Sequence, residues 1–129
     1  RLFELPLSQV QLRVPPTQVV VQESSPCLIS TASPSRTLAL TIRLGLFRPE
    51  QAGGTQAEIE KLLPLVARSL AKDHVANGGL GEKPWGDQWQ SAMWAAQTAQ
   101  LSWIIWDRLT QADRALIVAM LAHEADRFL

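Results

Sequence analysis

The feature that most constrains this chain is a glycine-rich stretch that leads directly into a long apolar segment, at residues 77–106. Glycine lets the backbone turn where other residues are strained, and the segment behind it has the length of a helix. All five tryptophans of the protein lie here: Trp85, Trp89, Trp94, Trp103 and Trp106. No other segment combines a flexible backbone, a helix start, aromatic faces and polar groups in so few residues. We therefore look for a functional site here first.

Charge and cysteine content exclude several classes of protein. Twelve basic and twelve acidic side chains cancel, so no overall field attracts nucleic acid or an anionic membrane, and we expect neither as a partner. The single cysteine, Cys27, excludes an intrachain disulfide framework and leaves the compartment undecided. No apolar run reaches the roughly 18 residues that a membrane-spanning helix requires. We expect a chain of 129 residues to form one domain.

Residues 1–36 differ in composition from the rest of the chain. Five of the eight prolines fall here, and each removes an amide donor and fixes φ, which prevents a long helix. The runs at residues 10–14 and 19–22 are rich in valine and suit short strands. We predict an extended arm or linker over 1–36, with a partly disordered leader as the equal alternative. The helical domain is then expected at 37–129.

Two patterns overlap in residues 37–47. Large apolar residues alternate with small or polar ones, which is the period of a half-buried strand, yet the same residues also form two adjoining stripes of a helix. Alanine, leucine and arginine favour a helix, and Ser35 is positioned to cap it. We predict the helix, with the strand as the alternative.

Capping signals predict the remaining helices. Thr55 and Glu58 fit a capping box that opens a helix at about 56–74, bent at Pro64 and ended before the glycine loop. A central helix is expected to begin at Asp87, and Thr110 with Asp113 starts a last helix that folds back as a hairpin. Along the central helix the alanines at 92, 95, 96 and 99 are expected to let a neighbouring helix approach closely. Its apolar surface is widened by Trp94, Leu101 and Ile105, beside one broad stripe that consists of Trp89, Ala92, Met93, Ala96, Ala99, Gln100, Trp103 and Trp106.

No sharp catalytic motif is found. The chain has no phosphate-binding loop and no nucleophile elbow, and His123 with Glu124 lacks the second histidine of a zinc helix. We therefore expect no metal and no cofactor. His74 precedes the glycine loop and is either a general acid or base facing a cleft or, more simply, a histidine that bonds the carbonyls at a helix end. His123 and Glu124, with Asp126 and Arg127, are interpreted as a solvated helix face in which a carboxylate pairs with the arginine.

The loop and helix start from Asn77 to Gln90 are the candidate binding site. Trp85 and Trp89 offer flat apolar faces of the kind that stack on sugar rings, and Asn77, Asp87 and Gln90 offer polar groups for hydroxyls. The alternative is that the tryptophans are core residues and Asp87 is only a helix cap.

Three segments carry a resemblance to a known group of proteins. Residues 83–94, 103–109 and 124–128 resemble one inner and outer helix pair of the α/α toroid carbohydrate-active enzymes, which include heparinase-like polysaccharide lyases and toroid glycosidases. The resemblance covers about residues 77–129. It implies a mainly α fold of antiparallel helical hairpins, and a secreted or periplasmic location is compatible with it. It also implies that Trp85, Asp87, Trp89 and Gln90 contribute to substrate binding.

The resemblance leads to our first functional hypothesis, a fragment or N-terminal part of a helical toroid protein that binds or degrades a polysaccharide. Those lyases use a tyrosine in proton transfer, and this chain has none, so we assign no catalytic residue. A complete ring needs more hairpins, so the remainder of a longer chain is the expected partner. The alternative is a non-catalytic helical interaction module that docks on a partner chain.

Overall fold

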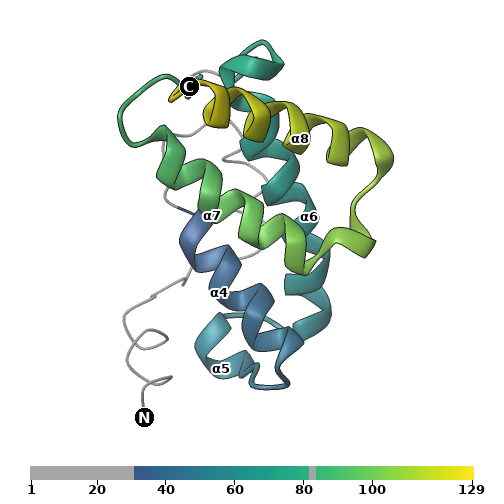
Figure 1. Cartoon of the computed structure of the whole chain (residues 1–129). Helices are drawn as coiled ribbons and strands as arrows, with labels where there is room; N and C mark the ends of the chain where they lie inside the picture. The colour runs from purple at the N-terminus through teal and green to yellow at the C-terminus, as the bar shows by residue number, and fades with distance from the viewer. Residues whose placement is uncertain (1–30, 82–83) are drawn as a thin grey trace.

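The computed structural model describes residues 31–81 and 84–129 (Figure 1). The expected strands at 10–14 and 19–22, and Cys27, lie outside the described residues. Within them the fold is mainly α, with five helices packed together, no strand, and a single isolated bridge between His74 and Trp85. The elements in chain order are α4 (Ala32–Arg43), α5 (Pro49–Ala52), α6 (Gln56–Asp73), the 3-10 turn η1 (Val75–Asn77), α7 (Ser91–Ile104), the 3-10 turn η2 (Trp106–Arg108) and α8 (Gln111–Asp126).

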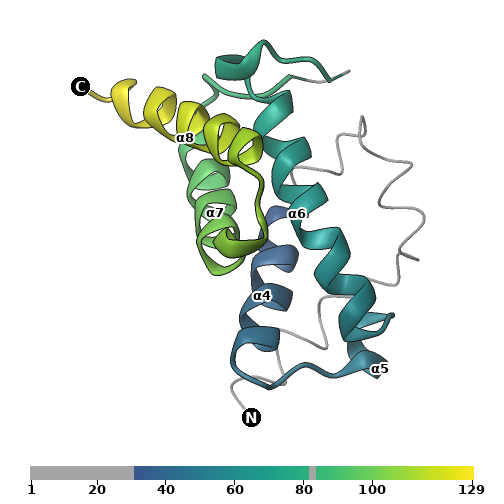
Figure 2. The same ribbon diagram turned by 90° about the vertical axis from the view of Figure 1, so that its right-hand side faces the viewer.

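The helices pack around one core. Helix α4 packs along α7 and α6, and α8 packs against both α6 and α7 (Figures 1 and 2). Between them lie the largest fully buried apolar side chains, Leu70, Leu101, Ile117, Met120 and Trp85. None of the described helices is long and apolar enough to span a bilayer.

Helix α4 confirms the helical interpretation of the first apolar segment but corrects its start. The helix begins at Ala32 and includes Pro34 in its first turn, where the missing amide leaves no intrahelical bond unmade. Thr31 is the N-cap residue, so the prediction that Ser35 caps this helix is wrong. Ser35 is instead buried inside the first turns.

Helix α6 follows the sequence prediction closely. Both bonds of the capping box are present: the Thr55 amide donates to Glu58 Oε2 at 2.8 Å, and the Glu58 amide donates to Thr55 Oγ1 at 3.2 Å. The helix continues through Pro64 to Asp73, and the bend expected at the proline stays a prediction. Gly78 closes the following η1 turn with a φ of 94°, a left-handed conformation that suits glycine.

Helix α7 begins four residues later than predicted. Asp87 has a φ of 63°, which is incompatible with a helical residue, so the chain turns once more before the helix. Gln90 is the N-cap residue and makes no side-chain capping bond. The local bond is made by Ser91, whose Oγ accepts from the Gln88 amide at 3.0 Å.

Helix α7 leaves much of the expected apolar stripe in water. Trp89, Met93 and Trp103 are 84%, 52% and 79% exposed, whereas Leu101 and Ile105, expected to widen the stripe, are buried. Small side chains let α4 approach closely. The buried hydroxyls of Thr98 and Ser102 donate hydrogen bonds to backbone carbonyls one turn earlier in α7. Close helix packing therefore outweighs the burial of the largest apolar groups. The buried face consists of Ser91, Ala95, Thr98, Leu101 and Ser102.

Helix α8 confirms the predicted cap and the predicted hairpin with α7. The Thr110 amide donates to Asp113 Oδ2, and the Asp113 amide donates to Thr110 Oγ1, both at 3.1 Å. The Asp113 carboxylate also accepts a hydrogen bond from Arg68 Nε at 2.6 Å, which connects the start of α8 to α6. Within α8, Ile117 and Met120 are buried, whereas Phe128, just beyond the helix end, is 68% exposed.

Candidate functional site

The loop that leads into α7 is anchored in the core by Trp85. Its ring is 1% exposed, and its Nε1 donates to the Leu70 carbonyl at 2.8 Å. The Trp85 amide donates to the Asp73 carbonyl, and the Val75 amide donates to the Trp85 carbonyl. The expectation that Trp85 offers a free face for stacking is therefore not met, because burial and two backbone bonds hold the ring inside.

His74 lies directly against this anchor. The residue is fully buried, and its ring meets the Trp85 ring edge-on at 4.6 Å between centroids. His74 Nδ1 accepts from the Ala76 amide at 3.1 Å, so the ring proton is assigned to Nε2, which donates to Glu124 Oε1 at 2.9 Å. Burial lowers the pKa of His74 below 6.5, against the opposing effect of Glu124. His74 thus neither faces an open cleft nor bonds a helix-end carbonyl.

Glu124 corrects the prediction of a solvated face at the end of the chain. The residue is 4% exposed, and its second oxygen, Oε2, accepts from Arg127 Nη1 at 2.6 Å, which confirms the predicted arginine partner. Burial alone would raise the pKa of Glu124, but the bonds from His74 and Arg127 outweigh it and hold the pKa below its usual range. The buried carboxylate is therefore ionised and fully bonded.

The last turn of α8 also holds the loop from outside. Arg127 Nη2 donates to the Gln88 carbonyl at 3.2 Å, and Arg127 Nε lies 3.5 Å from Asp87 Oδ1. His123 Nε2 lies 2.7 Å from the same oxygen, and this bond lowers the pKa of Asp87. We call the five side chains that these bonds connect the polar network: His74, Asp87, His123, Glu124 and Arg127.

The polar network contains three residues that a metal ion could use. Ligand atoms of Asp87, His123 and Glu124 all lie within 4.8 Å of one another. Both oxygens of Glu124 and the Oδ1 of Asp87 are already bonded, however, and the Arg127 guanidinium brings a positive charge to both carboxylates. This arrangement fits an ion-pair network that binds a loop to a helix better than it fits a metal site.

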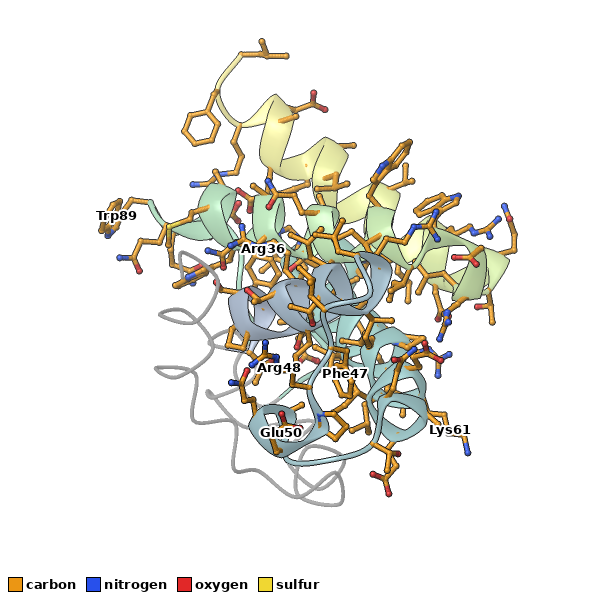
Figure 3. All side chains as sticks on the ribbon, turned by 90° about the horizontal axis from the view of Figure 1, so that it is seen from below. Arg36, Phe47, Arg48, Glu50, Lys61 and Trp89 are labelled. Carbon is orange, nitrogen blue, oxygen red and sulfur yellow. The ribbon has the colours of Figure 1, made fainter. Side chains whose placement is uncertain are left out.

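The structure divides the five predicted binding residues into two groups. Asn77 is half-buried, and its side-chain amide donates to the carbonyls of Ala71 and Leu116 at 2.8 Å, while Trp85 is in the core. The other three, Asp87, Trp89 and Gln90, lie at the start of α7. Figure 3 shows Trp89 projecting away from the helices. We call these three residues the loop-end surface.

A glycine sets the geometry of this loop. Gly86 has a φ of 122°, and a Cβ atom there would lie 2.5 Å from Val75 Cγ2 and 2.9 Å from His74 Nε2. Only a residue without a side chain fits both the backbone conformation and the contact with His74. The next residue, Asp87, is 60% exposed at its side chain, so the chain passes from core to surface within two positions.

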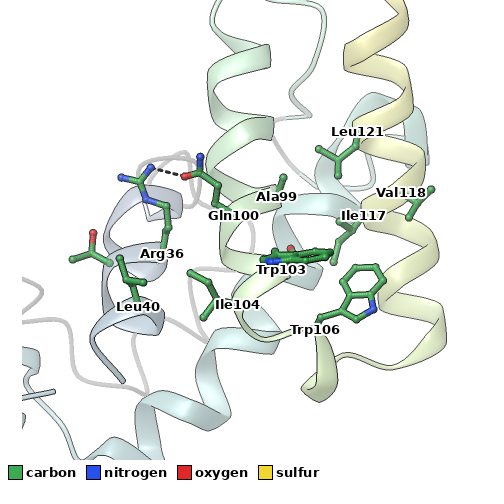
Figure 4. A pocket seen from close by; sticks show the side chains of 12 residues that line it. Arg36, Leu40, Ala99, Gln100, Trp103, Ile104, Trp106, Ile117, Val118 and Leu121 are labelled. Carbon is green, nitrogen blue, oxygen red and sulfur yellow. Dashed lines mark hydrogen bonds between the residues drawn. The ribbon is translucent and has the colours of Figure 1, made fainter. Parts of the chain in front are cut away.

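A second surface was not anticipated from the sequence. An apolar groove with a volume of about 750 Å³ lies between α4, α7 and α8 (Figure 4). At one end Arg36 Nη1 donates to Gln100 Oε1 at 2.8 Å. We call it the α4–α7–α8 groove. Its lining consists of Arg36, Thr37, Leu40, Ala99, Gln100, Ser102, Trp103, Ile104, Trp106, Ile117, Val118 and Leu121.

Known proteins add no constraint on this assignment. Comparisons with protein-family models, curated proteins and solved structures found no match to the chain. The features that bear on function are therefore the two surfaces, the loop-end surface and the α4–α7–α8 groove.

Proposed function

We propose that this chain is part of a helical toroid protein that binds or degrades a polysaccharide, and that the loop-end surface contacts the sugar. The observation that carries the proposal is the exposure of Trp89, whose ring is 84% exposed beside two polar side chains. An indole face covers the apolar C–H face of a sugar ring, while Asp87 and Gln90 supply hydrogen-bonding groups for its hydroxyls.

The support beneath the loop favours binding. Arg127 donates a hydrogen bond to the Gln88 carbonyl, and the buried Trp85 ring anchors the start of the loop in the core. A binding residue on a fixed loop loses less conformational entropy when a ligand arrives than one on a free loop does. In this proposal Trp85 and Asn77 position the loop, and Asp87, Trp89 and Gln90 touch the ligand.

The proposal extends to architecture and partners. The α7–α8 hairpin is of the kind that toroid proteins repeat around a ring, and the resemblance of residues 83–94, 103–109 and 124–128 to that class supports the same assignment. Further hairpins come from the remainder of a longer chain. We assign no catalytic residue, so the proposal specifies the ligand class, and its test is one of binding.

The test is a glycan panel probed with the full-length natural protein and with Trp89→Ala and Asp87→Ala. We expect each variant to weaken binding by about tenfold or more, which corresponds to ~1.4 kcal/mol. Trp103→Ala is the matched control, because Trp103 is similarly exposed but lies at the far end of α7, outside the loop-end surface. Unchanged binding of every glycan by both variants would remove the proposal.

A second function, a helical interaction module that docks on a partner chain, is favoured by one separate observation. The α4–α7–α8 groove leaves Trp103 79% exposed on an apolar face. The intact mass of the natural protein separates the two functions. A mass well above 14.3 kDa favours the toroid protein, and a mass near that value favours the interaction module.

A further inference from the structure

We infer that the α4–α7–α8 groove binds a second copy of this chain in a two-fold dimer, with Trp103 near the axis. The inference rests on the second function, the interaction module, and names its partner. It does not depend on the loop-end surface, which includes none of the residues that line the groove.

The groove and its rim leave large apolar side chains exposed to water. One residue from each of the three helices is exposed, with Leu40 at 44%, Trp103 at 79% and Val118 at 55%. Apolar side chains gathered on one face and bordered by polar ones mark protein interfaces more often than isolated exposed residues do. Tryptophan and arginine, which both line this groove, are also the residues enriched where interfaces bind most tightly.

The same face also has the shape that a two-fold interface requires. A two-fold interface uses the same surface on both copies, so that surface must offer both a projection and a hollow. Trp103 is 79% exposed at the wall of the hollow of about 750 Å³, whose apolar lining also includes Ile104, Ile117 and Leu121. The face can therefore insert its own tryptophan into the hollow of an identical face.

The charge of the chain permits self-association. Twelve basic and twelve acidic side chains give the chain a net charge of zero, so no long-range repulsion keeps two copies apart. Arg36 is the one charged residue in the groove lining, and its Nη1 donates to the neutral Gln100.

The ends of the groove complement each other under a two-fold rotation. Figure 4 places Arg36 and Trp106 on opposite sides of Trp103. A two-fold axis near Trp103 therefore brings the Arg36 of each copy toward the Trp106 end of the other. Asp107, which is exposed, directly follows the lining residue Trp106 in the chain. A groove lined with acidic side chains would have selected a cationic partner instead.

The experiment is sedimentation velocity of the full-length natural protein over a wide concentration range. We expect a monomer–dimer equilibrium in which Trp103→Glu raises the dissociation constant by about 30-fold or more. Trp89→Glu is the matched control, since Trp89 is equally exposed near the start of α7 but outside the groove, and it should leave the dissociation constant unchanged. Val118→Glu, on α8, repeats the test with a smaller residue.

Each result decides the matter. A wild-type protein that stays monomeric at all concentrations overturns the inference, and so does a dimer that survives both Trp103→Glu and Val118→Glu. Equal weakening by Trp89→Glu would place the interface elsewhere. A monomeric Trp103→Glu variant that still binds glycan would leave the loop-end surface intact, so failure of the dimer and failure of glycan binding are distinguishable.

Discussion

His74 Nε2 donates a 2.9 Å hydrogen bond to Glu124 Oε1, and this bond joins two buried residues that lie 50 positions apart in the chain. The bond fixes the end of α6 to the last turn of α8, and the second oxygen of the same carboxylate holds Arg127. Because Arg127 in turn holds the Gln88 carbonyl, one buried carboxylate connects the core to the loop-end surface.

Glu124→Ala should destabilise the protein strongly. The substitution leaves the buried Nε2–H of His74 without its acceptor and removes a partner of Arg127, and we expect a loss of about 2–4 kcal/mol in the free energy of unfolding. Asp126→Ala is the control, because Asp126 is exposed on the same turn, and it should change this free energy by less than ~0.5 kcal/mol. Urea denaturation of the two variants measures both values. Equal effects would show that the network contributes little to stability.

Stability should fall as the medium becomes acidic. The pKa of His74 in the folded protein lies below its unfolded value of 6.5, so as pH decreases the unfolded chain takes up this proton first. The pKa of Glu124 is also lowered, from 4.5, and its contribution is lost at still lower pH. The melting temperature should therefore decline from about pH 6.5 downward. NMR titration of the His74 ring gives the direct check, and a midpoint above 6.5 would contradict the argument.

Local signals in the sequence predicted much of this fold. Thr55 with Glu58, and Thr110 with Asp113, identified two helix starts to the residue, because a capping box involves neighbours only three positions apart. The start of α7 was predicted too early, since Asp87 resembles a cap in sequence. In the structure Asp87 adopts a left-handed conformation, and its carboxylate pairs with His123 of α8.

The burial of the tryptophans was harder to predict. Periodicity shows which residues share a helix face, but it does not say which face meets a neighbour. Here Ala95 and Thr98 face the core and Trp103 faces outward, because small residues allow the closest helix packing. Likewise, no local pattern pairs His74 with Glu124, since the two meet only after α6 and α8 have packed.

Gly86→Ala should be more damaging than Gly45→Ala, although both glycines have positive φ. The added Cβ would lie 2.5 Å from Val75 Cγ2 and 2.9 Å from His74 Nε2, so we expect a cost of at least ~2 kcal/mol. Gly45→Ala is the control, because Gly45 has a φ of 70° and nothing within 4 Å, and it should cost about 1 kcal/mol from backbone strain alone. Thermal denaturation measures the difference. Equal costs would mean that the loop can move away from His74.

Two tryptophan substitutions test the inverted burial of this chain most directly. Trp85→Phe removes the Nε1 bond to the Leu70 carbonyl and leaves a space in the core, so we expect a loss of about 2–3 kcal/mol. Trp103→Phe changes a ring that is 79% exposed, and in the isolated monomer it should alter stability by less than ~0.5 kcal/mol. Urea denaturation at a low protein concentration compares the two. The opposite order would show that α7 turns its large aromatic stripe toward the core after all.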